Sequence, residues 1–135
     1  EDLADLDAQA KALAAGWASH DFFFVHHKYT DSRGEDGDFD AKVKEIEKVD
    51  AFLPRILALK PDVIVVTGDH STPAVAKAHT SHPVPFLVNA AWVRPDGVKK
   101  FGERECARGT WSVIHGTHLM PIALSLAGKL KKYGA

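Results

Sequence analysis

Five acidic and imidazole side chains fall at positions where the sequence predicts the ends of strands. Asp31 and Glu35 come after one apolar run, and Asp69 and His70 follow a second run after Thr67 and Gly68. His79 comes nine residues after His70. Carboxylate oxygens and imidazole nitrogens are common protein ligands of Mn, Mg, Zn and Co ions. These residue types together predict a site for divalent cations that needs no thiolate.

Two apolar runs are expected to be the strands that position these side chains. Residues 22–25 are aromatic and branched, and residues 63–66 form a continuous branched run typical of a buried strand. Residues 39–59 repeat apolar side chains with a helical period; Asp38 can cap this helix, and Pro54 is expected to kink or divide it. Strand, helix and strand predict a βαβ unit with parallel strands. Ligands of such sheets collect beyond the carboxyl ends of the strands.

The rest of the pattern completes an α/β architecture. The other expected elements are helices over residues 3–17, 106–114 and 119–127, a strand over 83–88 and a turn-rich loop over 30–38. The sequence therefore predicts an α/β fold with three layers, in which a mainly parallel sheet is flanked by helices.

The composition excludes several classes of protein. The 135 residues, 45% of them hydrophobic and 26% charged, predict one globular domain. The formal net charge of -1 leaves no basic field for nucleic acid or an anionic membrane, so neither is an expected partner. The apolar runs are far shorter than the roughly 20 residues that span a bilayer. The chain starts without Met on a helical pattern, so we expect it to be a piece of a longer protein.

The cysteine content and the first residues indicate the compartment. Cys106 is the single cysteine, so an internal disulfide is impossible, and without a placed general base it is expected to be a packing residue. The acidic start, Glu1-Asp2, has no signal-peptide pattern. We expect a reducing cytoplasm.

Each candidate ligand could also have a purely structural role. Asp69-His70 could be a turn with a structural histidine, and the acidic cluster over 31–38 could be a solvated loop or a helix cap. The two groups and His79 reinforce one another, because all are expected at one end of one sheet. Ser71 and Thr72 are possible nucleophiles, but after Asp-His they are expected to support the turn. The other histidines are expected to be structural or surface residues: His20, His26, His27, His82, His115 and His118.

The candidate residues lie within longer stretches that carry a family resemblance. The stretches are VHHKYTDSRGEDGDFDAKVKEIEKVD, VVTGDHSTP, HTSHPVPFL, FGERECARG and LMPIALSLAGKLKKYGA. In these stretches, which cover nearly the whole chain, the sequence resembles the C-terminal part of the cofactor-independent phosphoglycerate mutases, in the archaeal-type branch of the alkaline phosphatase superfamily. TGDHSTP followed by His and PVP is fairly specific for that family, and the order of all five stretches is highly specific.

The resemblance implies a site with two divalent ions, usually manganese, with Mg, Co or Zn as alternatives. In the family a serine is phosphorylated and returns the phosphoryl group to the other hydroxyl of glycerate, so that 3-phosphoglycerate and 2-phosphoglycerate interconvert. By position, Asp31 and His79 would hold one ion, and Asp69 and His70 would hold the other.

The chain departs from the family pattern at one ligand. The family has a His four residues after the first Asp, where this chain has Glu35. A carboxylate there could replace the imidazole and favour Mn or Mg over Zn, or it could leave the metal weakly bound or absent.

The resemblance also implies that parts of the machinery lie outside the chain. The serine nucleophile, an early metal-binding aspartate and much of the substrate-binding region belong to an N-terminal half that this chain does not include. We therefore expect no mutase activity from the isolated chain. We also expect an unpaired sheet edge, which invites a homo-oligomer.

Two other functional classes remain open on the sequence. The chain could come from another phosphomutase or phosphohydrolase of the superfamily, since a two-metal site serves all of them. It could also be a noncatalytic binding module that keeps the ligands as structural groups.

Overall fold

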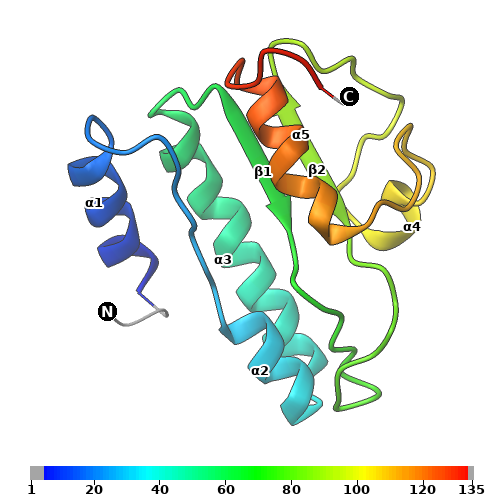
Figure 1. The fold of residues 1–135 in the computed structure, drawn as a ribbon. Helices are drawn as coiled ribbons and strands as arrows, with labels where there is room; N and C mark the ends of the chain where they lie inside the picture. Colours follow the sequence, from blue (N-terminus) through cyan, green and yellow to red (C-terminus); the bar gives the residue numbers. More distant parts are fainter. Residues whose placement is uncertain (1–4, 134–135) are drawn as a thin grey trace. The chain divides into compact units, whose positions relative to one another are not determined.

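The computed structural model describes residues 5–133, which form two units. Of these residues, the first unit comprises 5–61 and 72–80, and the second comprises 62–71 and 81–133. Figure 1 shows the helices of the first unit in blue to green and the two strands of the second unit in green.

The first unit begins with helix α1 (Leu6–Gly16), which packs on helix α3 (Phe39–Leu57). The carboxylate of Asp5 caps α1 by accepting from the backbone N–H groups of Asp7 and Ala8. Leu13 is buried in this packing region, where Phe52 of α3 is also buried. The predicted first helix is confirmed; its Leu3 lies outside the described residues.

Helix α3 confirms the second predicted helix and its cap. The Asp38 carboxylate accepts from the backbone N–H of Ala41 at 2.9 Å. Pro54 does not divide the helix, which continues for three residues to Leu57. A proline this close to the end removes one backbone hydrogen bond and leaves the preceding turns intact.

Two predictions for the first unit are wrong. The expected loop over 30–38 is mostly helix α2 (Tyr29–Asp36), which includes the apparent turn formers Ser32 and Gly34. Gly37, with φ of 77°, ends the helix in the left-handed conformation, and its N–H donates to the last turn. Residues 22–25 form no strand, since no segment among the described residues pairs with them; Phe23 instead stacks on Trp17 with ring centroids 5.0 Å apart. The βαβ unit built on that strand is therefore wrong.

The second unit contains strands β1 (Val63–Thr67) and β2 (Phe86–Ala90). They pair antiparallel, with Val65 opposite Val88, so the expected mainly parallel sheet is wrong for the described residues. The strand over 63–66 is confirmed. The third expected strand starts at Phe86 instead of residue 83, because prolines at 83 and 85 cannot donate to a ladder.

The C-terminal part of this unit is helical in short pieces. The helix expected over 106–114 is wrong: helix α4 (Glu103–Cys106) ends at the first of these residues, and Ser112 has a φ of 52°, outside the range of a right-handed helix. A 3-10 turn (Gly116–His118) leads into helix α5 (Leu119–Leu126), which contacts β1 and confirms the last predicted helix.

The predicted α/β class is confirmed: the chain combines helices with a small sheet. The three-layer arrangement stays a prediction. Among the described residues, no helix is both long enough and apolar enough to cross a membrane.

Candidate metal centre

Asp31 lies in the first turn of α2, and its carboxylate has a partner at each oxygen. The hydroxyl of Thr72 donates to Oδ1 at 2.5 Å, and the ammonium group of Lys28 pairs with Oδ2. The Asp31 side chain is only 12% exposed. A largely buried carboxylate with its orientation fixed on one side is a suitable ligand for a cation.

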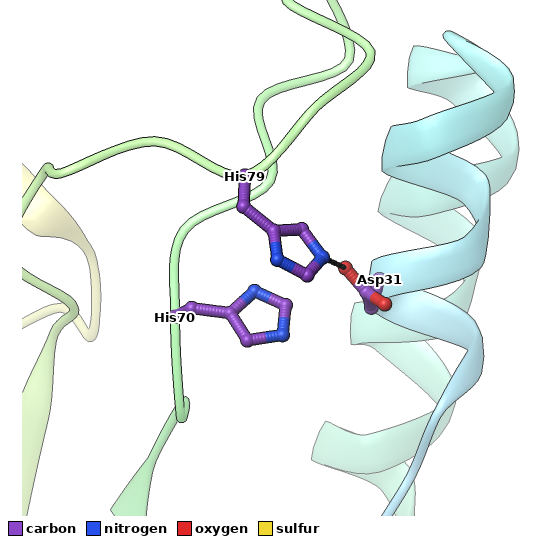
Figure 2. A group of neighbouring side chains, drawn as sticks. All are labelled: Asp31, His70 and His79. Carbon is purple, nitrogen blue, oxygen red and sulfur yellow. Dashed lines mark ion pairs between the residues drawn. The ribbon is translucent and has the colours of Figure 1, made fainter.

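His79 faces the same carboxylate from the segment that follows Thr72. Its Nε2 lies 3.5 Å from Oδ1 of Asp31 and 3.7 Å from Oε1 of Glu35. Figure 2 shows the ring of His79 turned toward Asp31, with the ion pair drawn as a dashed line. The side chains of His79 and Glu35 are about half exposed, so ions and solvent have access from this side.

Gly34 allows α2 to approach the segment that carries Thr72 and His79. A Cβ at this position would lie 2.2 Å from the backbone oxygen of Thr72, a distance that real Cβ atoms do not adopt. Lys42 of α3 holds the same region by donating to the backbone oxygen of Thr30 at 2.7 Å. The absence of a side chain at residue 34 therefore permits the contact between Asp31 and Thr72.

The other two predicted ligands belong to the second unit. The backbone N–H of His70 donates to Oδ1 of Asp69 at 3.1 Å, and its Nε2 lies 3.5 Å from Oδ2 of the same residue. The Asp69 side chain is 75% exposed. His70, also drawn in Figure 2, precedes Thr72 by two residues along the chain.

The structure thus brings the predicted ligands together in two groups, Asp31, Glu35 and His79 in one unit and Asp69 and His70 in the other. Thr72 does more than support a turn, because its hydroxyl orients the Asp31 carboxylate. Lys28 was not singled out from the sequence, although its spacing of three residues from Asp31 is one at which opposite charges pair.

A second ionic cluster joins α3 to the segment before α2. His27 Nε2 lies 2.9 Å from Oε2 of Glu45, and the ammonium group of Lys48 donates to Oε1 of Glu45 at 2.7 Å. The hydrogen bond from Lys48 is the main reason that the pKa of Glu45 lies below its ordinary value; the contact with His27 lowers it further, against the raising effect of burial. His27 is thus a structural residue, as expected.

The donor types of the first group fit a divalent cation. Carboxylate oxygens and an imidazole nitrogen suit Mn, Zn and Co, and carboxylates alone suit Mg. The neutral form of His79 can offer a lone pair at Nε2, which lies 3.5 Å from Oδ1 of Asp31, and the Thr72 hydroxyl donates to the same oxygen.

The comparisons with known proteins agree with this chemistry. A sequence model of the Metalloenzyme superfamily matches residues 2–126, and the chain belongs to this superfamily.

Individual proteins that are similar to this chain give a more specific comparison than the superfamily does. The chain is 53% identical over 130 residues to a probable 2,3-bisphosphoglycerate-independent phosphoglycerate mutase of Thermus thermophilus, covering 96% of this chain and 32% of the relative. A protein of the same name from Thermosipho africanus is 58% identical over 119 residues, covering 88% of this chain and 30% of the relative. The resemblance seen in the sequence is confirmed, and the chain spans about a third of the length of these curated relatives.

A solved structure also matches over almost the whole chain. The PH0037 protein from Pyrococcus horikoshii superposes with a TM-score of 0.90 at 37% sequence identity. The match covers 97% of this chain and 41% of that protein.

Proposed function

We propose that this chain is the C-terminal, metal-binding part of a phosphoglycerate mutase that interconverts 3-phosphoglycerate and 2-phosphoglycerate through a phosphoserine. The observation that carries the proposal is the buried Asp31 carboxylate, oriented by Thr72 and faced by the His79 imidazole at 3.5 Å. Membership of a metalloenzyme superfamily and the names of the similar relatives support it.

In this proposal Asp31 and His79 hold one divalent ion, and Glu35 is a further ligand because its carboxylate lies 3.7 Å from His79. Asp69 and His70 hold a second ion.

Each side chain then has a defined task. Divalent ions stabilise the charge that develops on oxygens during phosphoryl transfer. Thr72 fixes the plane of the Asp31 carboxylate, and His79 presents Nε2 to the same place from the exposed side. The predominance of carboxylates favours manganese or magnesium over zinc. The serine nucleophile comes from outside this chain, and the reaction belongs to glycolysis in the cytoplasm.

Manganese titration of the purified chain tests the metal site. The unsubstituted chain binds Mn²⁺, and Asp31→Asn weakens binding at least about tenfold, because the amide lacks the charge that attracts the ion. Asp36→Asn is the matched control: it removes the same charge from the same helix at an exposed position paired with Arg33.

Binding of Mn²⁺ that is equally tight in the two variants contradicts the proposed site. Absence of binding in the unsubstituted chain favours a module in which the same side chains are structural groups.

A further inference from the structure

Lys28 immediately precedes α2 and places its ammonium group against Oδ2 of Asp31. This contact occupies the oxygen opposite to the one that accepts from Thr72. The two partners of Asp31 differ in solvent exposure: Thr72 is 4% exposed, whereas the side chain of Lys28 is 48% exposed. One side of the carboxylate is therefore held by a buried hydroxyl, and the other by a long side chain that can extend into solvent.

We propose that Lys28 is the internal counter-cation of Asp31 and that it competes with a divalent ion for the negative charge of this carboxylate. This inference rests on the proposed function, because it takes Asp31 to be a metal ligand. It adds a residue that sets the affinity of the site without coordinating the ion.

The low exposure of Asp31 explains why a counter-cation is needed. A carboxylate that is 12% exposed has lost most of its hydration, and burying such a charge without a partner is unfavourable. The ammonium group of Lys28 supplies the compensating charge when no ion is bound.

Electrostatic repulsion explains why the ammonium group of Lys28 must leave Asp31 when an ion binds. A divalent cation at Asp31 and an ammonium group at the same carboxylate repel each other. The flexible, strongly hydrated side chain of Lys28 can move into water at little conformational cost. Each binding event therefore exchanges the ammonium group for the ion, and the measured affinity includes the free energy of breaking the Lys28–Asp31 pair.

Replacing Lys28 by an uncharged residue tests the competition. Lys28→Met is expected to tighten Mn²⁺ binding about three- to tenfold at fixed pH and ionic strength, since the competitor is gone. Lys28→Gln, which is closer to lysine in polarity, should act in the same direction if the Met variant folds poorly. Lys28→Arg keeps the charge and should leave the affinity within about twofold of the unsubstituted chain.

Arg33→Met is the matched control for long-range charge. Arg33 lies in the same helix, makes the same type of i,i+3 pair, with Asp36, at 3.0 Å, and is 40% exposed. This variant loses one positive charge as Lys28→Met does, and it should change Mn²⁺ affinity by less than about twofold because the nearby Asp31 contact remains.

The melting temperature without and with Mn²⁺ distinguishes competition by Lys28 from a general loss of stability in the variant. Without metal, Lys28→Met should melt at a lower temperature than the unsubstituted chain, and saturating Mn²⁺ should raise its Tm by more. Affinity in Lys28→Met and Lys28→Gln no tighter than in Arg33→Met overturns the inference. If Asp31→Asn also leaves binding intact, the proposed metal site fails with it; if Asp31→Asn abolishes binding, only the role of Lys28 fails.

Discussion

At the scale of single residues, Glu45 joins α3 to the segment before α2 through its contact with His27. Lys48 contributes most to lowering the pKa of Glu45 from its ordinary 4.5. A carboxyl group whose pKa is lower in the folded state than in the unfolded state stabilises the fold at any pH above its pKa in the unfolded state. That contribution is lost as the pH falls through its pKa in the folded state.

We therefore predict that Glu45→Gln removes part of the acid dependence of stability. The free energy of unfolding of the unsubstituted chain should fall as the pH decreases below about 4.5, and the variant should show a shallower decrease. At pH 7 the variant should lose about 1–3 kcal/mol, because a charge-assisted pair is replaced by a weaker one. Urea unfolding at a series of pH values measures both effects.

Glu47→Gln serves as the control for this measurement, since Glu47 is exposed on the same helix. The same pH dependence of stability in the two variants would contradict the role of Glu45.

At the scale of elements, the packing of α2 on the segment 72–80 depends on Gly34. Gly34→Ala places a methyl group 2.2 Å from the backbone oxygen of Thr72, so the two segments must separate. We expect a loss of about 1–3 kcal/mol of stability from this overpacking. Mn²⁺ binding should weaken as well, because the Thr72 hydroxyl no longer orients Asp31.

Chemical denaturation and manganese titration of the same sample test both consequences. Gly116→Ala is the control, since a Cβ at Gly116 meets no atom within 4 Å. Equal stability and equal affinity in the two alanine variants would show that the contact at Gly34 can adjust freely.

At the scale of the whole molecule, the chain spans about a third of its mutase relatives. We predict that the purified chain does not interconvert 3-phosphoglycerate and 2-phosphoglycerate, even when it binds Mn²⁺, because in the proposed function the serine that forms the phosphoenzyme comes from outside it. A coupled assay that follows product formation checks this prediction. Turnover that depends on Asp31 would contradict it and would require a nucleophile within these 135 residues.

The sheet provides a second prediction at this scale. Within the described residues it has two strands, β1 and β2, and a sheet this small leaves edges that can pair with another chain. We expect self-association at high concentration, measured by sedimentation. Leu87→Lys on β2, where Leu87 is 40% exposed, should shift the equilibrium toward monomer because a charge on an edge strand opposes pairing. A monomer at every concentration would contradict this expectation.

Local sequence patterns determined the features that depend on neighbouring residues. Apolar periodicity identified α1 and α3, and the branched run identified β1. The cap of α3 at Asp38 followed from residue type alone. The same residue types also identified the candidate ligands, because the chemistry of a carboxylate or an imidazole does not depend on the fold.

Tertiary structure decided the features that depend on a distant partner. Residues 22–25 had the composition of a strand, but no described segment pairs with them, and β2 runs antiparallel to β1 where a parallel pair was expected. The contact between Asp31 and Thr72 joins residues 41 apart in sequence. It requires the close approach at Gly34, which no local pattern encodes. A sequence can specify which side chains are able to bind an ion, but only packing over long separations brings their atoms within reach of one another.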